Sequence, residues 1–436
     1  MNPPLVSVLL VSWNTRDETR RCLDSLRATT GAGLRYEVVA VDNGSRDGSA
    51  EMLAADPDVR LTRNRHNVGF AAAVNQAYRQ SSGELVLLLN SDVVAHPGAL
   101  ETMVGFLRER PDAAGVSPLY LNPDGTFQQH YVQLPSFTAT IALVTALRRI
   151  PVFRRALHTF QMRGQDFSRP RQLASGSCML LRRAVLPADR VFDERFPLYW
   201  NDAMLARTLQ AAGHRLWMIP DAVVTHTRGA SCRLLGPAVR FRHLLGSLVC
   251  YLRLTEPRHR LILFRAVLIV DHVVKRIFGR HVTLGWGDLR AALRGDVGPL
   301  PDGDIRDWLV LSSADAWANT GRHSTALVGA LAADRRVLFV DPPARFSRWR
   351  STIRQVGDSV WLASVPTVLP LGRLLPPVDW LNRRVAAAVL RRWLDQRPGA
   401  RVLRVDEGGL RLGGRLGEDA TVAATPEAPT LEPSRG

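Results

Sequence analysis

The chain is poor in cysteine and almost without lysine. Its 436 residues include four cysteines and no CxxC pair, which argues against a disulfide framework or a zinc site and favours a reducing cytoplasm. Lys275 is the only lysine, so arginine carries almost all of the net charge of +17. No GxGxxG motif follows the first strand-like segment, which disfavours a dinucleotide site.

Long apolar runs are also missing. Residues 5–13 are apolar but lack a basic flank and a cleavage site, so they are typical of a first strand and not of a signal peptide. Residues 244–254 and 261–274 are interrupted by charges and fall short of the roughly 20 apolar residues that cross a bilayer. They fit basic amphipathic helices on a membrane surface, or alternatively a buried helical hairpin.

The positive charge is concentrated in one stretch. Residues 225–300 contain thirteen basic and four acidic side chains. Such a patch favours an anionic partner, namely phosphates, acidic lipid or nucleic acid, whereas the alternative is an arginine-biased composition on solvated faces. Because no nucleic-acid-reading motif is recognisable, we predict no nucleic-acid partner and expect an anionic membrane surface instead.

Strand-like and helix-like segments alternate in the first ninety residues. Strands are expected at 5–11, 36–41, 59–62 and 84–89, with helices at 17–29, 49–55 and 70–80. This alternation predicts an α/β fold with a parallel sheet covered on both faces. After about residue 295 the alternation restarts, which predicts a second, smaller α/β unit, and the end of the chain has a composition typical of disorder.

Three side chains stand where expected strands end. Asp92 follows strand 84–89, at the edge where open α/β sheets place their ligands. Asp42 ends the second strand and can accept hydrogen bonds from a base N–H or a ribose, or alternatively satisfy its own turn. Trp13 ends the first strand, where its ring can stack on a pyrimidine or belong to the core.

Six short sequence motifs, here called blocks, follow one another along the first 202 residues. They are VSWNT at 11–15, VDNGSRDGS at 41–49, NVGFAAAVN at 67–75, LNSD at 89–92, ASGSCML at 174–180 and FDERFPLYWND at 192–202. Together they resemble family 2 glycosyltransferases, which have a GT-A nucleotide-diphospho-sugar transferase fold, and specifically the rhamnosyltransferase-like branch. The resemblance implies donor binding by Trp13, Asp42, Gly69, Asn75 and Gly176.

The resemblance also implies a metal site and a base. Asp92 matches the residue that holds Mg²⁺ or Mn²⁺ against the donor diphosphate, and His226 matches a position that completes that site. Asp202 matches the catalytic base that deprotonates the acceptor in an inverting transfer. The family pattern Glu-Asp-x-Asp is not kept here, because Asn201 and Met204 replace its first and last acidic residues.

The C-terminal unit resembles the N-terminal half of a GT-B glycosyltransferase. The match rests on WLVLSS at 308–313, on residues 316–323 and on RVLFVDPP at 336–343. It covers only the acceptor side, so the unit is an acceptor-binding module, a fusion remnant or a truncated gene. The domains expected are therefore a GT-A domain at 1–235, a helical segment at 236–298, a GT-B-like unit at 299–412 and a disordered tail at 413–436.

The function expected is transfer of a sugar, such as rhamnose, from a nucleoside-diphosphate sugar. The acceptor would be a cell-envelope glycan or a polyprenyl-linked molecule, and the enzyme would be cytoplasmic and peripheral at the inner face of the cell membrane. The alternative is a non-catalytic nucleotide-sugar-binding or scaffold protein, which the replaced acidic positions Asn201 and Met204 suggest.

Overall fold

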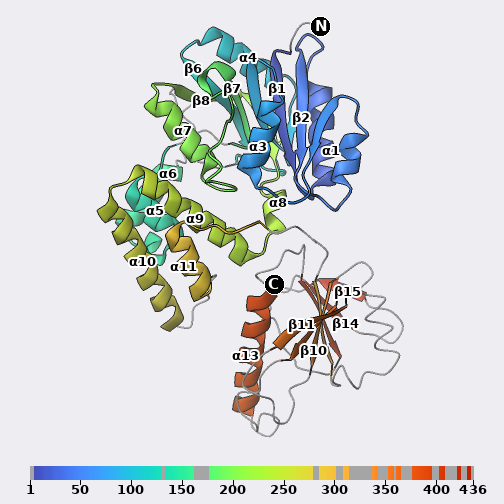
Figure 1. The fold of residues 1–436 in the computed structure, drawn as a ribbon, viewed down its shortest axis with the longest axis vertical. Helices are drawn as coiled ribbons and strands as arrows, with labels where there is room; N and C mark the ends of the chain where they lie inside the picture. Colours follow the sequence, from blue (N-terminus) through green and yellow to red (C-terminus); the bar gives the residue numbers. More distant parts are fainter. Residues whose placement is uncertain are drawn as a thin grey trace. The chain divides into compact units, whose positions relative to one another are not determined.

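The computed structural model describes residues 4–128, 133–161, 176–277 and 284–300, and beyond these the strands and the helix given below for the C-terminal unit (Figure 1). Two compact units are present. The first comprises residues 1–232 and 240–303, and the second comprises residues 233–239 and 304–436. Most of the helical segment that the sequence analysis set apart thus belongs to the first unit.

The first unit begins with a parallel sheet. Its strands are β1 (Val6–Ser12), β2 (Tyr36–Asp42), β3 (Val59–Arg63) and β4 (Leu85–Asn90), in the order β3-β2-β1-β4. Helices α1 (Arg16–Thr29), α2 (Ser49–Ala54) and α3 (Phe70–Arg79) connect them. The central strands are buried on both faces, which explains their near-continuous apolar sequence. The predicted alternation is confirmed, element by element.

The remaining strands make the sheet mixed. They are β5 (Val93–Ala95), β6 (Ala113–Leu121), β7 (Cys178–Arg182) and β8 (Arg215–His226), and they extend the sheet in the order β4-β7-β6-β8-β5. Strand β7 runs antiparallel to both β4 and β6, and β5 runs antiparallel to β8, while β6 and β8 are parallel. The parallel sheet expected from the sequence therefore holds for the first half only.

One core joins the two halves of the sheet. Leu87 and Leu89 of β4 lie in a single buried cluster with Leu23 of α1 and with Met103 and Leu107 of α4 (Ala99–Glu109). Helix α3 instead packs against β1 and β2 and buries Val74 and Tyr78. Helix α7 (Asn201–Ala211) runs directly into β8. This packing aligns the carboxyl ends of β1, β2 and β4 along one edge.

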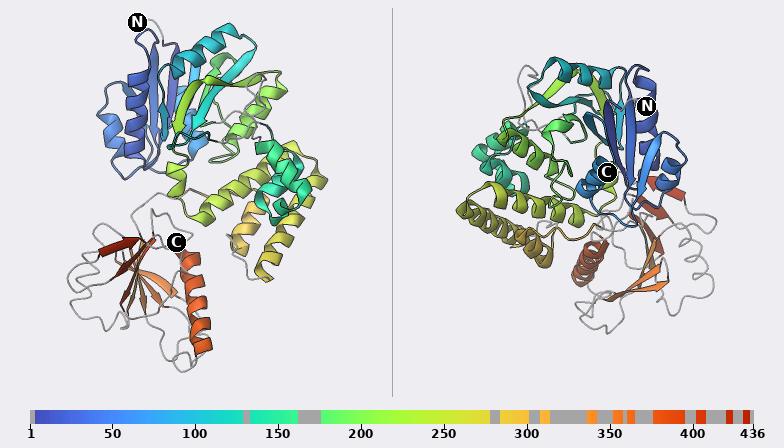
Figure 2. Two further views of the ribbon diagram at one scale, coloured as in Figure 1. Left: turned by 180° about the vertical axis from the view of Figure 1, so that it is seen from behind. Right: turned by 45° about the horizontal axis from the view of Figure 1, so that its top comes forward.

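A group of helices lies beside the sheet (Figure 1, Figure 2). It contains α5 (Phe137–Val144), α6 (Pro151–Gln161), α9 (Pro237–Thr255), α10 (Arg258–Ile277) and α11 (Trp286–Arg294). Shorter helical turns are η1 (Ala146–Arg149), η2 (Arg183–Val185) and α8 (Ala230–Arg233). Among the residues described, no helix combines the length and the apolar character that crossing a membrane requires.

The second unit contains its own sheet, in the order β11-β12-β10-β9-β13-β14-β15. The strands are β9 (Trp308–Ser313), β10 (Arg336–Asp341), β11 (Thr352–Gly357), β12 (Val360–Ser364), β13 (Val402–Glu407), β14 (Ala420–Ala423) and β15 (Thr430–Pro433). Helix α13 (Pro376–Leu394) buries Ala387 and Leu390 against Leu338 and Val340 of β10.

Two predictions made for the C-terminal part of the chain, a disordered tail and a GT-B-like unit, concern the residues of this sheet. Strands β14 and β15 lie within residues 413–436, where the composition predicted a disordered tail, and the two pair with each other antiparallel. The GT-B resemblance stays a prediction, because residues 316–323 and 342–343 lie outside the part of the chain that is described.

Candidate active site

The loops that follow β1, β2 and β4 are tied together by hydrogen bonds. The backbone N–H of Asn14 donates to Oγ of Ser45 at 2.9 Å, and the Asn14 side-chain oxygen accepts from the N–H of Arg46 at 2.8 Å. Thr15 and Ser91 are joined through their hydroxyls at 3.0 Å. The edge at which Trp13, Asp42 and Asp92 stand is therefore one connected surface.

Asp92 and His226 are brought together by strand register. Strand β5 pairs with the end of β8 so that Val93 lies opposite His226, and the residue before Val93 then faces the same imidazole. Nε2 of His226 lies 3.3 Å from Oδ1 of Asp92. The other carboxylate oxygen accepts from the N–H of Ala230 at 3.1 Å. Both side chains are buried, so residues 134 positions apart form one site.

The environment keeps the Asp92 carboxylate ionised. Burial by itself would raise the pKa of Asp92, but the imidazole of His226 in its positively charged form and backbone N–H groups, among them that of Ala230, outweigh it and lower that pKa below its usual value. The site therefore offers a carboxylate oxygen and an imidazole nitrogen side by side.

These two ligands fit a divalent cation in part. Nε2 of His226 is buried and makes no hydrogen bond, and that geometry leaves it available to a ligand. Among the residues described, no third histidine, cysteine, aspartate or glutamate joins them. A cation here would take its further oxygen ligands from a diphosphate and from water, as Mg²⁺ and Mn²⁺ do at phosphate-binding sites.

Asp202 lies at the first turn of α7. The preceding Trp200 has a positive φ of 68°, which turns the chain sharply into the helix. Oδ1 of Asp202 accepts from the N–H of Ala203 at 2.8 Å. Burial of the carboxylate raises the pKa of Asp202 above its usual value, although backbone N–H groups of Ala203 and Gly176 act in the opposite direction. The residue as a whole is half-buried.

Gly176 links Asp202 to the loop of Asp92. A Cβ at position 176 would lie 3.3 Å from Cβ of Asp202, so a larger residue would press against the aspartate. The next residue, Ser177, accepts a backbone hydrogen bond at 2.8 Å from the N–H of Asn90, two residues before Asp92. The structure thus brings the expected base and the expected metal ligands to the same edge of the sheet.

Trp13 and Asp42 are buried with unused polar atoms. Nε1 of Trp13 and Oδ1 of Asp42 have no hydrogen-bond partner, whereas Oδ2 of Asp42 accepts from the N–H of Ser45 at 3.0 Å. Burial raises the pKa of Asp42 despite its bonds to the following turn. Buried polar atoms are normally paired, so these two mark places where a ligand can bind.

Gly69 and Asn75 hold the backbone of neighbouring segments. Gly69 has a φ of 93°, and a Cβ there would lie 2.9 Å from Cβ of Pro197, so only glycine lets α3 begin so close to the segment that leads to Asp202. The side-chain oxygen of Asn75 accepts from the N–H groups of Val191 and Phe192, and its amide donates to the carbonyl of Phe192 and to Glu194. All of its usual hydrogen-bonding positions are filled.

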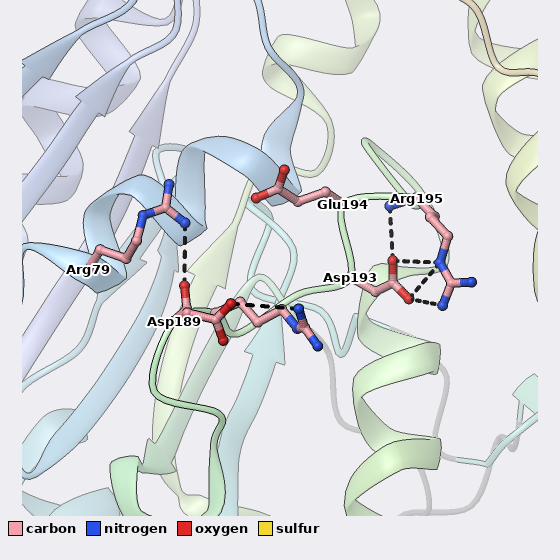
Figure 3. Close-up of a pocket in the computed structure, with 6 residues that line it drawn as sticks. Arg79, Asp189, Asp193, Glu194 and Arg195 are labelled. Atoms are coloured by element: carbon pink, nitrogen blue, oxygen red, sulfur yellow. Dashed lines mark hydrogen bonds and ion pairs between the residues drawn. The ribbon is translucent and has the colours of Figure 1, made fainter.

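A charged pocket is lined in part by the segment that Asn75 holds. Figure 3 shows it, and its lining residues are Arg79, Asp189, Arg190, Asp193, Glu194 and Arg195. Arg195 pairs with Asp193 at 2.6 Å and Arg190 pairs with Asp189 at 3.6 Å, so its charges largely satisfy one another. Neither Asp92 nor Asp202 lines this pocket, and it is not the site proposed below.

The comparisons with known proteins point to one family. The model of glycosyl transferase family 2 matches residues 7–188. N-acetylglucosaminyl-diphospho-decaprenol L-rhamnosyltransferase of Mycobacterium tuberculosis is 30% identical over 251 residues, which cover 52% of this chain and 77% of that protein. O-antigen biosynthesis protein RfbC of Myxococcus xanthus is 30% identical over 234 residues, 53% of this chain and 18% of that protein.

A solved structure, mannosyltransferase PcManGT of Pyrobaculum calidifontis in complex with GDP-Man and Mn²⁺, is a weaker likeness. It is 18% identical, has a TM-score of 0.40, and covers 76% of this chain and 81% of that one. The family model, which spans five of the six blocks singled out in the sequence, and the Mycobacterium relative together decide the matter. The chain belongs to family 2 of the glycosyltransferases, and it is a glycosyltransferase with the GT-A fold.

Proposed function

We propose that this glycosyltransferase moves a sugar such as rhamnose from a nucleoside-diphosphate sugar to a hydroxyl of a cell-envelope glycan or polyprenyl-linked acceptor. The observation that carries the proposal is the meeting of Asp92, His226 and Asp202 at one sheet edge, joined through Gly176 and Ser177. The relatives support the acceptor class, because one is named for a diphospho-decaprenol acceptor and another for O-antigen biosynthesis.

The nucleotide would bind at the ends of β1 and β2. The unused Oδ1 of Asp42 suits an N–H of the base or a ribose hydroxyl, and the ring of Trp13 lies one residue beyond the end of β1. Gly69 and Asn75 would act indirectly, because each holds backbone of the segment between the nucleotide and Asp202. Gly176 would act through its close approach to Asp202.

The diphosphate would lie at Asp92 and His226. Mg²⁺ or Mn²⁺ bound by these two side chains would neutralise the charge that develops on the leaving diphosphate. The chain's own contribution is a buried carboxylate that stays ionised and an imidazole nitrogen fixed beside it. Arg228, two residues after His226 and exposed, is placed to add positive charge at the same loop.

Asp202 would serve as the base. Its carboxylate takes the proton of the acceptor hydroxyl while the hydroxyl oxygen attacks the anomeric carbon from the face opposite the diphosphate. The new glycosidic bond forms as the bond to the diphosphate oxygen breaks, so the configuration inverts and the nucleoside diphosphate leaves. The raised pKa of Asp202 suits this role, because a stronger base takes the proton more readily.

Peripheral binding to an anionic membrane, at the inner face of the cell membrane, fits the outer surface of α10. Its inner residues Leu261, Phe264 and Leu268 are buried, whereas on the opposite face Val270 is 61% exposed and Ile277 is 73% exposed. The exposed apolar stripe repeats at helical spacing, and its members are Ile262, Leu263, Ala266, Ile269, Val270, Val274 and Ile277. Helix α9, in contrast, packs most of its apolar residues inside the protein.

Basic residues flank this apolar stripe. The N–H of Ala146 donates to Asp271 of α10 at 2.9 Å, which brings the exposed Arg148 and Arg149 beside the helix. An apolar face next to arginines is the pattern of a helix that lies in the interface of an anionic bilayer. A lipid-linked acceptor would be reached from that position.

Vesicle sedimentation tests the membrane proposal. The protein should bind anionic vesicles better than neutral ones, and more weakly as salt rises. Val270→Glu should weaken binding roughly 10-fold, because burying a valine is worth about 1.5 kcal/mol. Ala55→Glu adds the same charge at an exposed position just after α2 and serves as the control. Equal binding to neutral and anionic vesicles would contradict the proposal.

The competing function is a non-catalytic nucleotide-sugar-binding scaffold. Asn201 and Met204 favour it, since neither can replace the missing carboxylates as a proton acceptor at neutral pH. A screen of nucleotide sugars for donor hydrolysis and transfer, with Mg²⁺ and with Mn²⁺, decides between the two. Turnover that Asp202→Asn abolishes supports transfer, and binding without turnover by the parent protein supports the scaffold.

A further inference from the structure

The turn at residues 122–125 carries a side chain back onto the end of β8. The N–H of Asn122 donates to the carbonyl of Thr126 at 2.8 Å, and Gly125 adopts a φ of 80° that closes the turn. The chain then runs beside β6, where the N–H of Gln128 donates to the carbonyl of Tyr120 at 2.9 Å. Gln128 is thereby buried against His226, although the two residues are 98 positions apart.

The orientation of the Gln128 amide is fixed by two acceptors. Its Nε2 donates to the carbonyl oxygen of His226 at 2.8 Å and to Oδ1 of Asn122 at 2.9 Å. Both partners are oxygens that only accept hydrogen bonds. One is a backbone carbonyl, and the other is the side-chain oxygen of Asn122, whose nitrogen donates to Thr126 instead. The amide nitrogen must therefore occupy this side, and the amide oxygen must point the other way.

That oxygen determines the proton position on the imidazole. Oε1 of Gln128 lies 2.8 Å from Nδ1 of His226. An amide oxygen only accepts, so Nδ1 must carry the hydrogen in this bond. In the neutral ring the second nitrogen then has a lone pair, and this is the Nε2 that lies 3.3 Å from Asp92.

We propose that Gln128 is a positioning residue that holds His226 as the Nδ1–H tautomer and aims the Nε2 lone pair at the cation site beside Asp92. The inference rests on the proposed metal site and names a residue that none of the six sequence blocks contains. Partners of this kind fix the ring orientation of a metal-binding histidine, and their loss typically costs about 10- to 100-fold in metal affinity.

The test compares two substitutions that both remove the amide donor, only one of which keeps an acceptor, now charged, for Nδ1. Gln128→Leu removes both the acceptor and the donor, whereas Gln128→Glu keeps an acceptor for Nδ1 and loses the donor. The first readout is the tautomer of His226 in the metal-free protein, from ¹⁵N NMR of the ring nitrogens at a pH where the ring is neutral. The His226→Gln variant assigns the signal.

We expect the Nδ1–H form in the parent and in Gln128→Glu, and a gain of the Nε2–H form in Gln128→Leu. The second readout is the affinity for Mn²⁺ alone, measured by EPR, which should fall roughly 10- to 100-fold in Gln128→Leu and stay at or above the parent value in Gln128→Glu. If Gln128→Leu does not fold, the tautomer itself is still tested by the parent and by Gln128→Glu. An Nε2–H ring in either of them overturns the proposal.

A failure of the proposed metal site can be distinguished from a failure of the Gln128 proposal. A parent protein that shows the Nδ1–H tautomer but does not bind Mn²⁺ contradicts the metal site of the proposed function. A parent protein that binds Mn²⁺, together with a folded Gln128→Leu variant of unchanged tautomer and affinity, shows that Gln128 has no positioning role.

Discussion

Asp92 and Asp202 are two aspartates at the same edge of the sheet, one in the loop after β4 and the other in the first turn of α7, yet their surroundings shift their pKa values in opposite directions. Burial works against ionisation at both. At Asp92 the imidazole of His226 lies 3.3 Å away, and the pKa of the carboxylate ends below its usual value. At Asp202 the opposing contacts come from backbone N–H groups, and the pKa ends above its usual value.

The difference assigns a role to each carboxylate. A group that stays ionised under all working conditions suits a cation, whereas a group with a raised pKa suits the acceptance of a proton. On this proposal the same residue type would serve two functions, because Asp92 lies beside a histidine and Asp202 lies in the first turn of a helix. Four predictions test this division.

The largest effect is expected at Asp92. Asp92→Ala removes the carboxylate ligand and should lower transfer on the order of 1,000-fold, since neutralising the leaving diphosphate is worth several kcal/mol. Metal-dependent donor binding should disappear with it, as measured by calorimetry with and without Mn²⁺. The folded state is checked by circular dichroism. Unchanged donor affinity in the presence of Mn²⁺ would end the assignment.

A smaller and different effect is expected at Asp202. Asp202→Asn keeps the size of the side chain and removes its ability to accept a proton. The rate constant for transfer should fall about 100-fold or more, the usual contribution of a general base, while donor affinity stays near that of the parent. Transfer at the parent rate would show that another group is the base.

The pH profile gives a third test. Because the pKa of Asp202 is raised, transfer should decline with falling pH at a higher pH than an ordinary aspartate would cause. Asp92, with its lowered pKa, stays ionised throughout that range. With donor and metal saturating, the parent should show this acidic decline and Asp202→Asn should lack it. A decline that persists in Asp202→Asn would assign it to a different group.

The first half of the sheet could be predicted from the sequence better than the second half. The strands β1 to β4 could be predicted because their apolar runs and the turns between them are local signals, and the positions of Asp42 and Asp92 at strand ends followed. The insertion of β7 between β4 and β6 could not be predicted, because the antiparallel pairing of Leu87 with Leu180 joins residues 93 positions apart.

The same limit explains what the sequence missed around the site. Gln128 stands in none of the six blocks, and only the closed turn at 122–125 brings it to His226. Asn75 was identified by its block as a donor-binding residue, but its block does not show that its side chain is already bonded to residues 191–194. Helices α9 and α10 look alike in composition, and packing alone separates the buried one from the one with an exposed apolar face.

The smallest effect concerns stability, and its sign should differ between the two aspartates. Asp202 has a raised pKa in the folded protein, so the folded state binds the proton more tightly and loses stability as pH rises from the unfolded pKa through the folded one. At neutral pH Asp202→Asn should therefore unfold at a slightly higher temperature than the parent, on the order of 2 °C.

Asp92 has a lowered pKa, so it contributes stability above its ordinary pKa that is lost as pH falls through the folded value. Asp92→Asn should unfold at a lower temperature at neutral pH, and both differences should shrink under strongly acidic conditions, where all these carboxyls are protonated. Thermal unfolding in the presence of a chelator measures both without any contribution from bound metal. Shifts of the same sign in the two variants would mean that the two carboxylates do not differ in the way that their surroundings indicate.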